Sequence, residues 1–362
     1  MSAALSSPPK YKVTWRTFAL PLIGLVAFFA YIYLFNVDIP GIIAEIQKIK
    51  SYYYVLAIAV SLLDVLFFTL AWHFLLKFLK VKLSFLKSFA FVWIGIYVDT
   101  VIPAESVSGE LAKIYLVNEE EDGTAGKATA SIVAQRLIGM GINVATLLVG
   151  AAFLLVQSLL YGMMLTLILF LITMVCLFFT LVLFFSFREK WTFRMLDGLI
   201  RFAEWITRGH WKPDKFREEV VSVHRGFHQA IKEYVRAPKT MALAISLSVI
   251  SWVFALLVFF LTFLAIGYVQ ISWGAILVIS AIFVAVKSVP VGVPFEVGLP
   301  EIVLTILLQG FGVPVAIGAT ATILMRLLTL WLRFFVGFGA QQWLGIKAVM
   351  SRSNGEANHG PG

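Results

Sequence analysis

The sequence predicts an all-α polytopic membrane protein with six transmembrane helices and two re-entrant helical hairpins arranged as inverted repeats. The first observation is composition: 60% of the 362 residues are hydrophobic and 14% are charged. Soluble domains are less apolar and carry about a quarter charged residues. The second is a series of long apolar runs separated by basic segments. The third is a polar, Pro/Gly-containing block that occurs twice.

The repeated block reads VIPAESVSGE at residues 101–110 and VPFEVGLPE at residues 293–301. Each block lies between apolar runs too short to cross a bilayer, and each is followed by an arginine in the next apolar span. Broken hydrophobic segments at corresponding positions of two halves point to a transport site. The matching residues are Pro103, Glu105, Glu110 and Arg136 in the first half, and Pro294, Glu296, Glu301 and Arg326 in the second.

The first half is expected at residues 13–187, after a disordered tail at residues 1–12. Its hairpin, at about residues 89–117, begins with an apolar run at residues 89–102. That run would reach roughly 21 Å, against about 30 Å for the hydrocarbon core. We therefore expect it to enter and return on the cytoplasmic side, with its broken backbone covered by protein or lining a watery cavity. The full spans are expected at 18–34, 53–76, 130–156 and 161–187.

Residues 188–239 contain the largest concentration of lysine and arginine, which predicts a cytoplasmic location. Charged and apolar residues alternate at helical spacing there, which indicates two amphipathic helices on the headgroups or on the bundle. His224 and His228 are one helical turn apart and would form half of a metal site. Because no third ligand is evident, we expect a solvated face and no metal.

The second half, residues 240–346, repeats the order of the first. A span at 241–266 precedes a hairpin at about 273–310, and the last span is 315–338. This hairpin would enter from outside, which makes the halves inverted copies. Residues 347–362 are expected as a C-terminal tail. The protein is therefore predicted to be a multi-pass protein of the cell membrane with both termini cytoplasmic.

Ionisable residues at bilayer depth cost at least about 2.5 to 3.5 kcal/mol, so they are rare unless paired or functional. In a structural interpretation each glutamate neutralises an arginine and fixes hairpin to helix. In a functional one, the planar arginine fork binds phosphate, aided by half-helix N-termini. Arg136 and Asn143 are seven residues apart, as are Arg326 and Arg333, so each pair should share one helix face. The candidate substrate-binding residues are Glu105, Glu110, Lys113, Arg136, Asn143, Lys287, Glu296, Glu301, Arg326 and Arg333.

The run IPAESVSGELAKIYLV, then SIVAQRL, then the second hairpin ending in Glu301, resembles the flippase-like integral-membrane region of the lysylphosphatidylglycerol synthases. Gly109, Glu110, Lys113 and Arg136 match that pattern. The resemblance implies a translocase for a phospholipid or a polyprenyl-phosphate-linked lipid. The synthases also carry a soluble aminoacyl-transferase domain, and this chain ends too soon to hold one. We therefore expect a stand-alone member that is not an enzyme and performs no lysyl transfer.

Two alternatives remain. A non-catalytic scaffold would recruit partners through the basic loop. A membrane-embedded transferase would use Glu105 or Glu110 as general base, but it needs a donor site, and the sequence has neither a Gly-rich phosphate loop nor a suitable carboxylate pair. The expected partners are the bilayer and an anionic lipid or lipid-linked carrier. No cofactor, metal or nucleic acid is expected, and a homo-oligomer is compatible with the sequence.

Overall fold

The computed structural model describes residues 47–102, 107–158, 162–206, 214–287 and 298–357, and within these ranges the chain forms helices and no strand. Five helices are long and apolar enough to cross a membrane, and each overlaps an expected span. The sixth expected span, at residues 18–34, lies outside the described residues. The five are Ser51–Phe78, Ala125–Val156, Leu165–Phe187, Pro238–Ile266 and Val315–Gly345.

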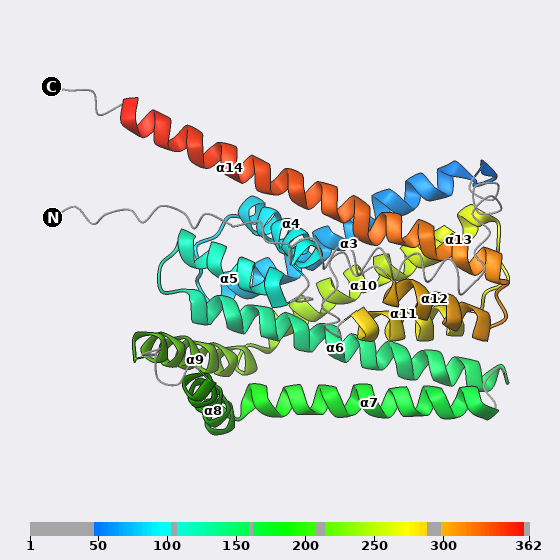
Figure 1. Ribbon diagram of the computed structural model, residues 1–362, viewed down its shortest axis with the longest axis horizontal. Helices are drawn as coiled ribbons and strands as arrows, with labels where there is room; N and C mark the ends of the chain where they lie inside the picture. Colours follow the sequence, from blue (N-terminus) through cyan, green and yellow to red (C-terminus); the bar gives the residue numbers. More distant parts are fainter. Residues whose placement is uncertain (1–46, 103–106, 159–161, 207–213, 288–297, 358–362) are drawn as a thin grey trace.

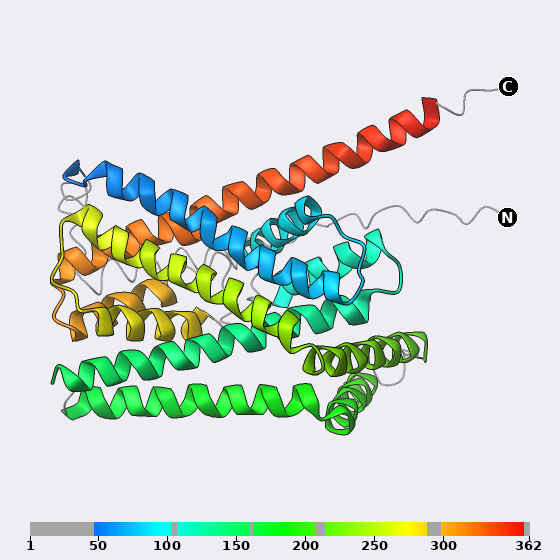
Figure 2. The same ribbon diagram turned by 180° about the vertical axis from the view of Figure 1, so that it is seen from behind.

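The long helices run roughly along one axis and pack side by side (Figures 1 and 2). Both views place α4 and α5 near one end of that axis and α11 and α12 near the other. The elements are α3 (Ser51–Phe78), α4 (Phe85–Val101), α5 (Val107–Glu120), α6 (Ala125–Val156), α7 (Gly162–Phe187), α8 (Glu189–Ile206), α9 (Asp214–Val235), α10 (Pro238–Ile266), α11 (Trp273–Lys287), α12 (Leu299–Gly310), α13 (Val315–Arg326), the π-helical segment η2 (Leu327–Leu332) and α14 (Arg333–Ala357).

The short helices frame the two broken blocks. α4 has 17 residues, more than expected, because it begins at Phe85, after Ser84 accepts a hydrogen bond from the Lys87 amide. At about 1.5 Å per residue its length stays below the roughly 30 Å of a hydrocarbon core. α11 and α12 have 15 and 12 residues. Each half therefore contains a pair of helices shorter than a membrane crossing.

Among the described residues, the two largest of three apolar cores lie at different ends of the bundle. One contains Trp72, Leu75 and Phe91, which join α3 and α4 to α6 and α9. The other contains Phe263 and Ile279, which join α10 and α11 to α6, α12 and α13. α6 contributes to both cores, so this one helix connects the first pair of short helices to the second.

Glycines allow the closest helix contacts. A Cβ on Gly109 of α5 would lie 2.2 Å from the Gly95 carbonyl oxygen of α4. On Gly337 of α14, it would lie 2.5 Å from the Trp93 carbonyl oxygen of α4. On Gly274 of α11, it would lie 2.9 Å from a Leu154 side-chain carbon of α6. Small residues let the backbones of membrane helices approach in this way.

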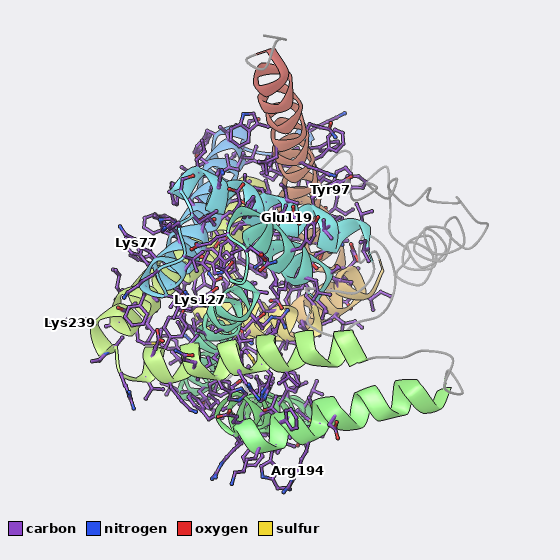
Figure 3. The ribbon with its side chains drawn as sticks, turned by 90° about the vertical axis from the view of Figure 1, so that its left-hand side faces the viewer. Lys77, Tyr97, Glu119, Lys127, Arg194 and Lys239 are labelled. Atoms are coloured by element: carbon purple, nitrogen blue, oxygen red, sulfur yellow. The ribbon has the colours of Figure 1, made fainter. Side chains whose placement is uncertain are left out.

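α8 and α9 lie across one end of the bundle, which Figure 3 views directly with Lys77, Lys127, Arg194 and Lys239 labelled. α9 docks on the bundle: Ile231 is buried, and the buried Tyr234 hydroxyl donates to the Leu75 carbonyl oxygen of α3 at 2.9 Å. A Cβ on Gly126 of α6 would lie 3.0 Å from the Gly226 Cα of α9. The two amphipathic helices expected in the basic segment are therefore present.

The solvated face expected for the two histidines is wrong. His224 and His228 are buried, with ring centroids 4.4 Å apart. His224 also contacts the Phe193 ring of α8. α8 thus contacts His224 across the α8–α9 interface, and sequence spacing alone does not reveal that contact.

The last span also differs from expectation. The helix continues to Ala357, so most of the segment expected as a C-terminal tail is helical. The π-helical segment lies directly between Arg326 and Arg333. A π turn holds more residues than an α turn, so seven residues no longer return the chain to the same face. The expectation that these two arginines share a face is wrong for this reason.

Candidate functional site

The first broken block is followed by a helix start that a carboxylate from α4 stabilises. Asp99 Oδ1 accepts hydrogen bonds from the Gly109 amide at 2.6 Å and from the Ser108 hydroxyl at 2.9 Å. A carboxylate at this position satisfies an amide of the first helical turn and complements the helix dipole. Asp99 therefore holds the start of α5 against α4.

The next residue of α5 forms an ion pair with α6. Glu110 Oε1 contacts Arg136 Nε, and the two side chains are 23% and 40% exposed. Lys113, one turn further on, is buried, and its ammonium lies 5.2 Å from the Trp72 ring centroid, a distance suited to a cation–π contact. The first half therefore brings Glu110, Lys113 and Arg136 to neighbouring turns of α5 and α6.

The second broken block has a corresponding arrangement. Gly298 has φ of 106°, a conformation that favours glycine, and its amide donates to Glu301 Oε2 at 2.7 Å. The other carboxylate oxygen of Glu301 lies 2.6 Å from Arg326 Nε of α13. These side chains are 6% and 5% exposed. Glu301 thus caps α12 and pairs with the arginine of the next long helix.

The two halves therefore share one construction. In each, a glutamate in the first turn after the broken block pairs with an arginine on the following long helix. Glu110 and Glu301 occupy matching positions of the two sequence blocks, and each pairs with the arginine that follows its block. The halves differ in exposure: the pair in the first half is partly open, and the pair in the second half is buried.

The other candidate residues lie elsewhere or outside the described chain. Asn143 Nδ2 of α6 donates to the Ala281 carbonyl oxygen of α11 at 3.2 Å, which links the halves. Arg333 of α14 lies 2.6 Å from Asp64 Oδ2 of α3. Lys287 is half-buried at the end of α11. Glu105 and Glu296 lie outside the described residues.

Sequence reasoning missed Asp64 and Asp99. Asp64 accepts the Ser251 hydroxyl of α10 at 2.6 Å as well as Arg333, so it joins three helices. Both aspartates are charged residues inside apolar runs, which is itself a signal for a paired or functional group. Within the described ranges, no group of three His, Cys, Asp or Glu side chains is placed to bind a metal ion.

Known proteins are similar to this chain over most of its length. Residues 21–337 match the family model of the lysylphosphatidylglycerol synthase TM region. A UPF0104 membrane protein of Pyrococcus horikoshii is 25% identical over 285 residues, covering 78% of this chain and 84% of the relative. A UPF0104 membrane protein of Methanocaldococcus jannaschii is 23% identical over 360 residues, covering 96% and 99%.

Proposed function

Because the chain belongs to the family of the lysylphosphatidylglycerol synthase TM region, we propose that it is a flippase-like translocase that binds the anionic headgroup of a lipid between its two broken blocks. The lipid would be a phospholipid or a polyprenyl-phosphate-linked carrier. The observation that carries this proposal is the matched pair of contacts, Glu110 with Arg136 and Glu301 with Arg326.

Arginine supplies the chemistry for the headgroup. A guanidinium binds carboxylate and phosphate through the same parallel hydrogen bonds. In this structure each glutamate contacts the Nε atom of its arginine and so balances its charge. A lipid phosphate would exchange with the carboxylate without leaving the guanidinium uncompensated, and the nearby helix start would add positive potential for the anion.

The arrangement of the halves supports movement between leaflets. In this proposal α4–α5 and α11–α12 are re-entrant hairpins of inverted repeats that reach the membrane interior from opposite sides. Rocking of one repeat against the other would then expose the headgroup site to either leaflet. We call Glu110 with Arg136 the first half-site and Glu301 with Arg326 the second half-site. Their unequal exposure fits a state in which the first half-site is open and the second is closed.

The remaining parts of the proposal follow from the same topology. Both termini and the segment 188–239 are cytoplasmic, and the protein is a multi-pass protein of the cell membrane that catalyses no chemical change. Its partners are the bilayer and an anionic lipid or lipid-linked carrier. Glu105, Glu296, Lys113, Lys287, Asn143 and Arg333 complete the candidate substrate-binding set.

The test replaces each half-site arginine with lysine, which keeps the charge and loses the fork. Arg136→Lys and Arg326→Lys should fold, as measured by thermal unfolding, and should transfer a fluorescent anionic phospholipid between leaflets of proteoliposomes several-fold more slowly. Arg194→Lys, on the exposed part of α8, is the matched control. Normal transfer by both lysine variants would make the arginines structural, and the headgroup site would then be sought at Lys287 and Arg333.

The same proteoliposomes separate the alternatives. A scaffold would leave the lipid distribution unchanged even with the wild-type protein. A transferase would change the mass of the lipid during the assay. Transfer of an unmodified lipid, dependent on the two arginines, is the result that the translocase proposal requires.

A further inference from the structure

A second lipid-facing feature lies on the opposite side of α6 from the proposed headgroup site. It is an open apolar groove of about 450 Å³ between α6, α7, α9 and α10. We refer to it as the lateral groove. It is lined by Ala134, Leu137, Ile138, Gly141, Ile142 and Ala145 of α6, Leu183 and Phe187 of α7, Ile231, Tyr234 and Val235 of α9, and Met241 and Ile245 of α10.

Helical geometry separates this groove from the half-site. With about 3.6 residues per turn, Ala134, Ile138 and Gly141 lie on one face of α6 and Arg136 lies on the opposite face. Arg136 turns toward α5, where it contacts Glu110. The lateral groove is therefore a separate site.

The groove has an apolar interior. Among the described residues that line it, only Tyr234 carries a side-chain hydroxyl, amide or charge, and its hydroxyl already donates to the Leu75 carbonyl oxygen. The volume lies in the range of small-molecule sites, about 300 to 1,000 Å³. An alkyl chain fits such a surface, whereas a polar ligand would find no partner inside.

The rim of the groove is cationic. Arg188 follows Phe187, Arg236 follows Val235, and Lys239 lies two residues before Met241; all three are exposed. Glu233, the nearest acidic residue on α9, instead lines a separate hollow between α9 and the α5–α6 turn. Glu189 is occupied by Lys232, whose ammonium lies 2.9 Å from its carboxylate. Positive charge therefore dominates where the groove meets the end of the bundle viewed in Figure 3.

We propose that the lateral groove binds one acyl chain of an anionic phospholipid, with the phosphate held at the rim of Arg188, Arg236 and Lys239. Moving an alkyl chain from surrounding lipid into an apolar groove changes its environment little, so chain burial alone gives little selectivity. Selectivity comes from the headgroup, because basic residues at the membrane surface attract anionic lipids. Phosphatidylglycerol should bind there in preference to phosphatidylcholine.

The experiment uses the full chain in phosphatidylcholine vesicles that contain a small share of a photoactivatable lipid, with a diazirine in the acyl chain. The probe is either phosphatidylglycerol or phosphatidylcholine, and mass spectrometry maps the adducts. Groove residues on α6, α7 and α10 should be labelled several-fold more by the phosphatidylglycerol probe. Leu177 and Leu181, exposed on α7, should be labelled equally by both probes.

Two variants test the two parts of the site. Exchange of Arg188, Arg236 and Lys239 for glutamine should lower phosphatidylglycerol labelling to the phosphatidylcholine level, and matched changes at Lys77 and Lys127 should not. Gly141→Leu should remove groove labelling by filling the space, since a Cβ there meets only Phe179, at an ordinary 3.6 Å. Arg136→Lys should leave groove labelling intact, which separates this inference from the proposed translocation.

Three outcomes would overturn the inference. Equal groove labelling by the two probes would mean that the lipid there is ordinary bilayer lipid. Unchanged labelling in both the glutamine and the Gly141→Leu variants would mean that the adducts arise elsewhere. Absence of groove adducts with both probes would mean that no acyl chain occupies the groove.

Discussion

At the scale of single residues, matched sequence does not give matched environments. Arg136 and Arg326 occupy corresponding positions and bind corresponding glutamates, but the first side chain is 40% exposed and the second is 5% exposed. Sequence symmetry alone predicts that equivalent substitutions behave alike. The difference in burial predicts that they do not, because removing one partner of a buried pair leaves an uncompensated charge.

Arg326→Gln should therefore cost roughly 3 to 5 kcal/mol of stability. Arg136→Gln should cost about 1 kcal/mol or less, because its pair is partly open. Thermal unfolding in the same detergent measures both. The double variant Arg326→Gln/Glu301→Gln should recover part of the loss by removing the stranded carboxylate. Equal losses at the two arginines would contradict the burial argument.

A second prediction concerns His224, on the surface helix α9. Burial lowers the pKa of its imidazole below the usual 6.5, and His228 lowers the pKa further, while Glu189 opposes the shift. The unfolded chain therefore binds more protons between the folded pKa and about 6.5, so stability decreases as the pH falls through that window. The melting temperature should fall below about pH 6.5 and be level above it.

His224→Gln should flatten that dependence while Lys77→Gln, at the same end of the bundle, should not. If the melting temperature of the His224 variant still falls with pH by as much as that of the wild-type protein, the pH dependence belongs to another group.

At the scale of elements, glycine contacts hold the short helices in place. The α4–α5 pair is closest at Gly95 and Gly109, and a Cβ on Gly109 would lie 2.2 Å from a backbone oxygen and 2.4 Å from Asp99 Oδ2. Unlike the end of a flexible side chain, a backbone oxygen cannot move aside unless the helix itself shifts. The geometry of the first half-site therefore depends on a contact between helices as well as on the charges that it carries.

Gly109→Ala should accordingly separate α5 from α4, with a cost of about 1 to 3 kcal/mol. Gly139→Ala, on α6, is the matched control, because an added Cβ there meets nothing within 4 Å. The control should gain about 0.5 to 1 kcal/mol from better helix propensity. The comparison uses denaturation midpoints, and a neutral Gly109→Ala would show that the helix pair can open without loss.

The elements that sequence predicted well are those fixed by local patterns. Apolar runs long enough to span a bilayer identified the five long helices. The repeated blocks contained the glutamates and arginines of the two contacts, but they did not indicate which glutamate of each block pairs with the arginine. The remaining features depend on tertiary packing. Asp99 reaches Gly109 only because the helices α4 and α5 fold back on each other, and His224 of α9 is buried against Phe193 of α8. The π-helical segment, which directly precedes Arg333, has no evident signal in LLTLWL.

At the scale of the whole molecule, the two pairs of short helices lie near opposite ends of the long axis (Figures 1 and 2). The ends of α3 and α7 and the starts of α6 and α10 gather at the end that carries α8 and α9. Lys77, Lys127, Arg194 and Lys239 lie on this face (Figure 3). Excess lysine and arginine on one set of loops orients a membrane protein with that face in the cytoplasm.

The orientation expected from this charge distribution gives the last prediction. In a Cys176→Ser background, cysteines at Asp122 and Lys239 should react with a membrane-impermeant maleimide only after the membrane is opened, because both residues lie beside the basic face. Gln157 follows the end of α6 and Ser272 precedes the start of α11, both at the opposite end of the bundle. Cysteines at these two positions should react in intact cells. Since α5 returns to the end from which α4 starts, labelling of Asp122→Cys from outside would require α4–α5 to cross the membrane. That outcome would remove the inverted repeat on which the translocase proposal rests, while outside labelling at all four positions would instead indicate leaky cells.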